Sequence, residues 1–212
     1  MPQPVLWYFA DPMCSWCWGF TPVMEQIKRQ YDARLKIALV MGGLRPGTTD
    51  PITPSLRDEL LHHWDQVQRR SGAEFRTDGA LPEGFVYDTE PAARAVLTVG
   101  GLQPDATFAF YQSVQAAFYT RGVDVTRADA LTRLAEEQGI EPLQFLEEFD
   151  SDRARRKTRM HFVQTRSYGV QGFPTLIGEG GGEFRVLTRG YQEFPSLQAQ
   201  LDAWLAGTDT AP

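Results

Sequence analysis

The fold of this chain is decided by the stretch Val5-Leu-Trp-Tyr-Phe-Ala-Asp-Pro-Met-Cys-Ser-Trp-Cys-Trp-Gly-Phe20. Its first six residues, Val5–Ala10, are apolar and rich in aromatic side chains, which predicts a short buried strand. From Cys14 to Tyr31 the apolar residues recur at helical spacing, which predicts a helix with one buried face. The two cysteines therefore stand where a buried strand passes into a helix.

Cys14 and Cys17 are the two cysteines of the chain, and they form a C-x-x-C pair at the start of the predicted helix. Side chains three positions apart lie side by side on one helical turn. The first sulfur is close to unpaired backbone N–H groups and to the positive end of the helix dipole, which favours the thiolate, the nucleophilic form. We therefore expect Cys14 to attack and Cys17, one turn further along, to be more buried and to act as the resolving thiol.

Two other interpretations of the cysteine pair remain open. The first is a pair of ordinary buried thiols, and the second is a zinc site, within this chain or shared between two chains. Zinc needs four ligands, but there is no second cysteine pair, His62 and His63 are adjacent and diverge on a helix, and His161 stands alone. Haem attachment would need a histidine where Trp18 stands. We therefore expect no bound metal and no resident cofactor.

The rest of the chain predicts a mixed α/β fold. The predicted elements are a second strand at 35–41, helices from about 54 to 168, strands at 173–177 and 184–188 around a glycine turn at 178–182, and a last helix carrying 197–205. The order β-α-β, helices, β-β-α predicts a mixed sheet of about four strands, with a right-handed crossover between the first two. The helical block is too long for a loop, so we expect an insertion subdomain at 46–168 within a domain formed by 1–45 and 169–212.

A second motif lies far from the cysteines, in Gly172-Phe173-Pro174-Thr175. Proline is tolerated at the first residue of a strand and favours an extended conformation at Phe173 before it. Since cis bonds are a small minority before proline, about 5–6%, the residues alone predict a trans bond here.

Four segments together resemble the DsbA-like clade of the thioredoxin superfamily, and most of all its cytoplasmic branch of predicted protein-disulfide isomerases. They are Phe9-Ala-Asp-Pro-Met-Cys-Ser-Trp-Cys-Trp-Gly-Phe20, Gly169-Val-Gln-Gly-Phe-Pro-Thr-Leu176, Gly42-Gly-Leu-Arg-Pro-Gly47 and Asp88-Thr-Glu-Pro-Ala-Ala-Arg94. The resemblance covers essentially the whole chain. It implies a thioredoxin fold with helices inserted after the second strand. It also implies that Pro174 is cis and packs against Cys14 and Cys17, and that the backbone of Phe173 pairs with an extended substrate strand.

The chain also departs from that family at the site. The dipeptide between the cysteines, Ser15-Trp16, is neither the Pro-His of DsbA nor the Gly-Pro of thioredoxin, and it carries no imidazole to stabilise a thiolate. Relatives often have a buried acid six residues before the first cysteine, where this chain has Tyr8. Asp11 is the nearest carboxylate; it is either a proton acceptor for Cys17 or, as we favour, a turn residue before Pro12. Trp16 and Trp18 flank Cys17, and we expect one to be exposed beside the nucleophile and the other to be core.

Composition narrows the class of protein. Lysine and arginine number 21 against 27 aspartate and glutamate, so the net charge is −6, which argues against a general nucleic-acid binder. The apolar runs fall short of the ~18 residues that a membrane span needs. A secretory signal has a basic start followed by a long apolar stretch, and the sequence after Met1 does not have this pattern. We therefore expect a cytoplasmic protein with neither nucleic-acid nor membrane partners, in a compartment where cysteines are more often catalytic than structural.

These features predict a thiol–disulfide oxidoreductase acting on protein or small-molecule thiols and disulfides, with glutathione as a candidate co-substrate and a recycling partner that the sequence does not identify. One alternative is a glutathione-dependent transferase or isomerase similar to kappa-class relatives of the fold, which usually carry serine where Cys14 stands. Another is a non-enzymatic holdase or interaction module that uses the helical insertion. Intact Cys14 and Cys17 favour the oxidoreductase.

Overall fold

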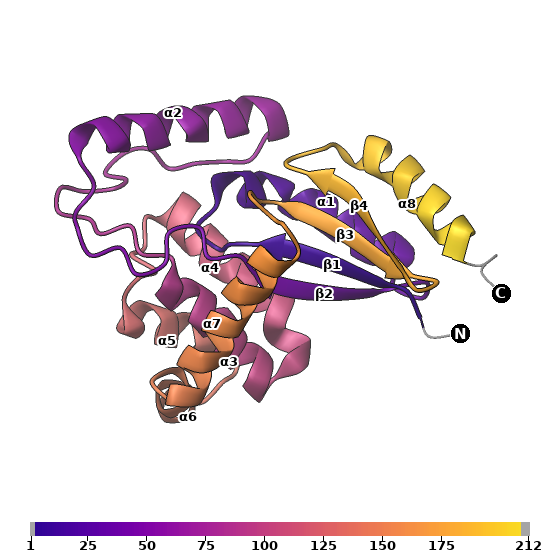
Figure 1. Ribbon diagram of the computed structural model, residues 1–212. Coiled ribbons are helices and arrows are strands. Elements are labelled where there is room, and N and C mark those ends of the chain that lie inside the picture. The colour runs from indigo at the N-terminus through magenta and orange to yellow at the C-terminus, as the bar shows by residue number, and fades with distance from the viewer. Residues whose placement is uncertain (1–2, 209–212) are drawn as a thin grey trace.

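The computed structural model describes residues 3–208, and its centre is a four-stranded sheet in the order β2-β1-β3-β4 (Figure 1). The strands are β1 (Val5–Ala10), β2 (Lys36–Met41), β3 (Thr175–Gly180) and β4 (Glu183–Arg189). β1 runs parallel to β2, with Val5 opposite Lys36, and antiparallel to β3, with Phe9 opposite Thr175. The predicted mixed sheet of about four strands is confirmed, and β1 has the bounds that its apolar run predicts.

Alternation along β1 assigns its side chains to two faces of the sheet. Leu6, Tyr8 and Ala10 belong to the main core, which also contains the buried face of α1 (Ser15–Tyr31) and α8 (Phe194–Thr208). Phe9 belongs to a smaller cluster on the opposite face, together with Val40, Val170 and Ile177. The sheet is therefore packed on both faces, and the loop that follows β1 emerges between the two layers.

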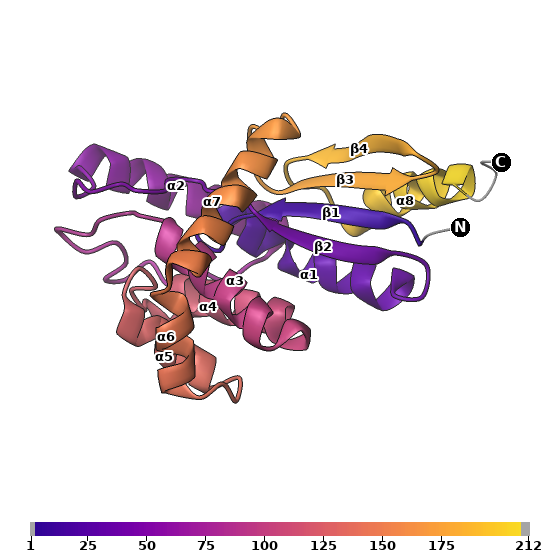
Figure 2. The ribbon, with the colours of Figure 1, turned by 60° about the horizontal axis from the view of Figure 1, so that its bottom comes forward.

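Helices join β2 to β3 and gather toward the end of the sheet where β1 and β2 finish (Figures 1 and 2). They are α2 (Pro54–Ser71), α3 (Glu90–Leu102), the short 3-10 helix η1 (Pro104–Ala106), α4 (Thr107–Arg121), α5 (Ala128–Glu136), α6 (Pro142–Phe149) and α7 (Asp152–Ser167). Polar caps fix several starts: Thr53 accepts the N–H of Leu56, and Ser151 accepts that of Ala154. The helical insertion in an α/β thioredoxin fold is confirmed.

The turn between the last two strands is shorter than the sequence predicts, so the predicted bounds are wrong. The glycine-rich segment 178–182 was expected to be a turn, but β3 continues through Gly180 and the chain reverses at Gly181 and Gly182, both with positive φ. Gly178 lies within β3, and the indole of Trp204 packs on it; a β-carbon there would come within 2.4 Å of the ring. This glycine serves close packing of α8 rather than chain reversal.

Candidate active site

Cys14 lies at the carboxyl end of β1, where the chain turns into α1. It is the N-cap residue of that helix, with extended backbone angles, but its side chain makes no capping hydrogen bond. The thiol instead lies 3.7 Å from the carbonyl oxygen of Phe173, to which it can donate. The predicted place of Cys14 at the start of the helix is confirmed, and its sulfur sits at the positive end of the helix without a capping hydrogen bond.

Cys17 lies beneath Cys14, one turn into α1, and the two residues approach to 3.3 Å. Cys17 is 0% exposed and Cys14 6%, so the predicted difference in burial is confirmed. Burial raises the pKa of the Cys17 thiol well above its ordinary value, and Cys14 raises it further, while the backbone N–H of Asp11 opposes the rise. Both cysteines are free thiols. Cys14 is therefore the more exposed of the two thiols, and Cys17 lies directly behind it.

The Phe173–Pro174 bond is cis. The trans bond predicted from base rates is therefore wrong, and the cis bond implied by the family resemblance is confirmed. Pro174 is buried, and its carbonyl accepts the N–H of Gly190 at 2.7 Å, which ties the loop to the end of β4. Among the described residues, no backbone group pairs with the N–H of Phe173.

Asp11 is 0% exposed and holds two loops together. Its Oδ1 accepts the N–H of Met13 at 2.9 Å, and its Oδ2 accepts the N–H of Leu44 at 2.8 Å. Burial raises the pKa of the Asp11 carboxyl to about 6, although the hydrogen bonds from Leu44 and Met13 oppose the rise. The bond to Met13 fits the predicted turn role, and the bond to Leu44 adds a tether that the sequence does not indicate. A role for Asp11 as proton acceptor stays a prediction.

Trp16 and Trp18 are both half-buried, so the expected division into one exposed and one core tryptophan is wrong. The Trp16 ring lies 5.8 Å from that of Tyr191, at the start of the segment leading to α8. Trp18 stacks on Tyr119, and its indole N–H donates to the carbonyl of Glu74 at 3.0 Å. Each ring contacts a different part of the chain because the two are two positions apart on the helix. Ser15, between the cysteines, is also half-buried.

Two contacts at the site come from residues that the sequence did not single out for it. The hydroxyl of Tyr87 donates to the carbonyl of Met13, just before Cys14. Gly42 lies against the ring of Phe173 and leaves no space for a side chain. The only signal for either was their membership in, or nearness to, the family-like segments at 42–47 and 88–94.

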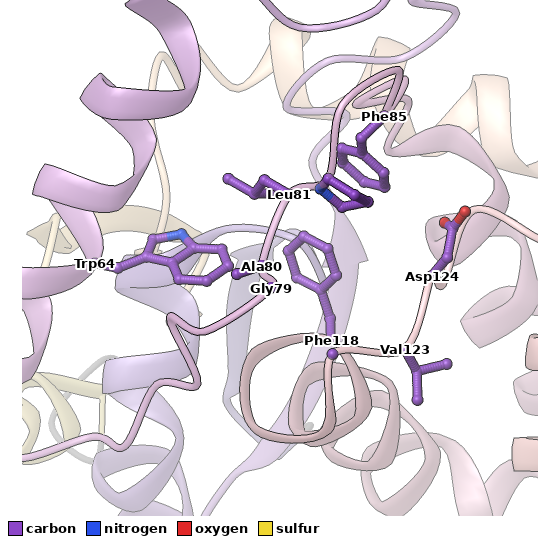
Figure 3. Close-up of a pocket in the computed structure, with 10 residues that line it drawn as sticks. Trp64, Gly79, Ala80, Leu81, Phe85, Phe118, Val123 and Asp124 are labelled. Carbon is purple, nitrogen blue, oxygen red and sulfur yellow. The ribbon is translucent and has the colours of Figure 1, made fainter. Parts of the chain in front are cut away.

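The helical insertion also contains a cavity of about 90 Å³ (Figure 3). Its lining is mainly apolar: Trp64, Gly79, Ala80, Leu81, Pro82, Phe85, Phe118, Gly122, Val123 and Asp124. Phe118 stacks on Tyr87 with 6.2 Å between ring centroids, and Tyr87 in turn bonds the loop before Cys14. Neither cysteine is among the residues that line the cavity.

Comparison with known proteins identifies the family. The profile of the DSBA-like thioredoxin domain matches residues 5–202. The chain therefore belongs to the DSBA-like thioredoxin family.

Two solved structures are similar over nearly the whole chain. A proposed protein disulfide isomerase from Nitrosomonas europaea is 42% identical, with a TM-score of 0.92, and the match covers 97% of this chain and 98% of that one. The cytosolic disulfide reductase DsbM from Pseudomonas aeruginosa is 28% identical, with a TM-score of 0.76 and 97% of each chain covered. The similarity includes the helical insertion, because it extends over both full lengths.

A more distant relative is named for a different role, that of an adapter protein. The ClpXP adapter protein SpxH of Halalkalibacterium halodurans is 22% identical over 179 residues, which is 81% of this chain. The match spans 57% of the length of that relative.

Across residues 3–208 of the chain, no helix has the length and apolar character needed to cross a membrane.

Proposed function

We propose that the protein catalyses thiol–disulfide exchange with Cys14 as the attacking and Cys17 as the resolving thiol. The Cys14 thiolate attacks a substrate disulfide, whose S–S bond breaks, so that a mixed disulfide forms and one substrate sulfur leaves as a thiolate. The Cys17 thiolate then attacks the sulfur of Cys14, releases the second substrate sulfur and leaves a Cys14–Cys17 disulfide. Two electrons pass from the protein to the substrate, and the reverse sequence oxidises a dithiol.

The observation that carries this proposal is the asymmetry of the two thiols. Cys14 is the more exposed, at 6%, and it stands at the positive end of α1. Cys17 is fully buried and 3.3 Å away. A substrate sulfur bound to Cys14 is therefore within reach of Cys17, whereas Cys17 itself is closed to a substrate.

The loop of Phe173 supports an extended peptide as one class of substrate. The carbonyl of Phe173 faces Cys14, and the N–H of Phe173 has no backbone partner among the described residues. A strand added at this point would make main-chain hydrogen bonds that do not depend on its sequence. We propose that Phe173 in this way presents different protein disulfides to Cys14.

We further propose that the protein works in the cytoplasm and that glutathione is its co-substrate. Support comes from DsbM, which is named a cytosolic disulfide reductase and whose structure with GSH is 27% identical to this chain, with a TM-score of 0.75. In this role, two glutathione molecules reduce the Cys14–Cys17 disulfide and become glutathione disulfide. Equilibration in glutathione buffers tests the direction: a reduction potential at or below about −220 mV fits a reductase, and one near about −120 mV fits an oxidant.

Trapping of the mixed disulfide tests the mechanism. The variants Cys17→Ala and Cys14→Ala are each incubated with a disulfide-containing protein and examined by mass spectrometry, with Ser15→Ala as a control that keeps both thiols. We expect a stable mixed disulfide with Cys17→Ala only, and turnover with Ser15→Ala. Full turnover by Cys14→Ala would contradict the assigned roles.

A second candidate function is protein binding without redox chemistry. It is favoured by the SpxH relatives, which are named ClpXP adapters, and by exposed apolar side chains on helices of the insertion, such as Leu143, Met160 and Val163. A chain with both cysteines replaced by alanine distinguishes the two functions. Binding of unfolded client proteins that survives this replacement supports the second function, and its loss supports exchange.

A further inference from the structure

Behind Cys17 lies a group of polar side chains that the exchange steps above do not use. Tyr8 comes from β1, Tyr111 and Gln115 come from α4, and Thr21 comes from α1 one turn beyond Cys17. All four are buried, with exposures between 0% and 9%. Buried polar groups are costly unless they are hydrogen-bonded, so their convergence on one thiol needs a reason.

The hydrogen bonds among them form a continuous chain. The Thr21 hydroxyl lies 2.9 Å from Gln115 Oε1, and Gln115 Nε2 lies 3.0 Å from the Tyr111 hydroxyl. The hydroxyls of Tyr111 and Tyr8 are 3.4 Å apart. Cys17 is in turn one of the neighbours that raise the pKa of the Tyr8 hydroxyl, through its charge and through a side-chain hydrogen bond. Since Thr21 also lies 3.3 Å from the carbonyl of Cys17, the chain begins and ends at the same residue.

The chemistry of these groups fixes the direction of the protons. With its Oε1 toward Thr21, Gln115 can only donate to Tyr111 through its amide N–H. The Tyr111 hydroxyl therefore has its own proton free for Tyr8, and the Tyr8 proton is left to point at Cys17. Burial raises the pKa of both tyrosines well above its ordinary value, so both hydroxyls keep their protons at neutral pH and can donate.

We propose that Tyr8 is a catalytic residue of the resolving step, in which its hydroxyl donates a hydrogen bond to the sulfur of Cys17 as that sulfur becomes a thiolate. Tyr111 and Gln115 are positioning residues, because they act only by holding the hydroxyl of Tyr8. The inference rests on the proposed exchange through Cys14 and Cys17.

Bonds and protons balance in the resolving step. Cys17 loses its proton and attacks the sulfur of Cys14, the Cys14–Cys17 bond forms, and the bond from Cys14 to the substrate sulfur breaks. That sulfur leaves with the electron pair and takes up one proton, so no net proton is gained or lost. Burial opposes the thiolate of Cys17, and a donor aimed at the charged form favours it. A hydrogen bond to a charged group is worth roughly a tenfold to hundredfold change in rate.

Two-phase reaction with 5,5′-dithiobis(2-nitrobenzoate) tests the proposal in stopped flow. With the reduced full chain, attack by Cys14 releases the first thionitrobenzoate, and resolution by Cys17 releases the second. We expect Tyr8→Phe to leave the first phase unchanged and to slow the second about tenfold or more. The rate of the second phase should also shift to higher pH by about one unit, because a tenfold loss of thiolate is regained by one pH unit.

Two further variants and one control complete the experiment. Tyr111→Phe and Gln115→Leu should slow the second phase in the same direction by a smaller factor, and they also provide the test if Tyr8→Phe does not fold. The matched control is Tyr31→Phe, which removes a buried tyrosine hydroxyl at the far end of α1, bonded to Asp202 at 2.9 Å. Wild-type rates in both phases for Tyr8→Phe and Tyr111→Phe would overturn the inference. Absence of the second phase in the wild type would instead overturn the proposed function.

Discussion

The ring of Phe173 packs directly on the backbone of Gly42, at a separation that excludes any side chain at position 42. A β-carbon there would lie 2.1 Å from Cζ and 2.2 Å from Cε1 of the ring. Gly42 directly follows β2, and its N–H donates to the carbonyl of Ala10 at 2.7 Å. Since the carbonyl of Phe173 faces Cys14, this contact holds a loop distant in sequence in place beside that thiol.

Gly42→Ala is expected to displace Phe173 and to impair the use of protein substrates. The added methyl group must push the ring away, and the backbone that we propose to pair with substrate moves with it. A misplacement of this kind can cost roughly tenfold or more in turnover. We expect the KM for insulin disulfides to rise while the reaction of Cys14 with a small aromatic disulfide keeps its rate.

Gly172→Ala is the matched control for this prediction. Gly172 is the neighbour of Phe173, but nothing lies within 4 Å of a β-carbon placed on it. It should therefore keep the wild-type KM for insulin. If Gly42→Ala and Gly172→Ala behaved alike, the packing of Gly42 would have no part in substrate use.

Asp11→Asn should remove a pH dependence from the stability of the fold. Burial raises the pKa of Asp11 from 3.8 to about 6, so between these values the folded state binds more protons than the unfolded state. This group therefore makes the protein less stable as pH rises from about 4 to about 6, by about 3 kcal/mol at most. Urea unfolding at pH 4.5 and 7.5 measures this pH dependence. Between these two pH values, the free energy of unfolding of the wild type should fall relative to that of Asp11→Asn. A difference between the two proteins that does not change with pH would exclude this role.

The segment around the cysteines could be predicted because its signals are local. An apolar run marks β1, helical spacing marks α1, and the C-x-x-C pair lies between them. These signals predict that Cys17 is buried and that Cys14 directly precedes the helix. The structure confirms both predictions. The sequence did not indicate the partner of the Cys14 thiol, which is the carbonyl of Phe173, 159 positions away.

The remaining contacts of the site could not be predicted because they join distant segments. The bond from Asp11 to Leu44 and the contact of Gly42 with Phe173 depend on how three loops meet, and no periodicity in the sequence carries that information. The same reason explains the last hairpin. A run of glycines is typical of a turn, but Gly178 lies within β3, where the indole of Trp204 leaves no space for a β-carbon.

Arg94→Met should destabilise the fold by about 3 kcal/mol or more, because it breaks a buried ionic cluster. The guanidinium is 5% exposed and donates to Glu90 Oε1 at 2.9 Å and to the carbonyl of Phe149 at 2.7 Å. It also lies 3.8 Å from the centre of the Phe149 ring. Methionine fills a similar volume but leaves the carbonyl without its donor, so α3 loses its link to the end of α6. Urea unfolding provides the measurement.

Arg133→Met is the control for the arginine prediction. Arg133 pairs with Asp129 at 3.0 Å within α5, but its side chain is 70% exposed. An exposed pair of this kind contributes little to stability, because water and salt screen the two charges. Equal losses for Arg94→Met and Arg133→Met would show that burial of the Arg94 cluster does not matter.

His161 should remain neutral in the folded protein at any pH above about 5. Burial, with a smaller contribution from the charge of Lys157, lowers its pKa from 6.5 to about 4. Its Nδ1 accepts the N–H of Met41 at 3.3 Å, which requires the tautomer protonated on Nε2. Because the folded pKa is lowered, this contribution to stability is present at neutral pH and is lost as pH falls from about 6.5 toward 4.

An NMR titration of the imidazole carbons tests the state of His161. We expect its signals to move only near pH 4, and Lys157→Met to raise the midpoint slightly, since burial is the larger cause. His161→Gln should remove the acid-sensitive part of the stability while keeping an acceptor for Met41. A midpoint near 6.5 in the wild type would mean that the end of β2 is open to solvent, so α7 would not be packed there as the structure has it.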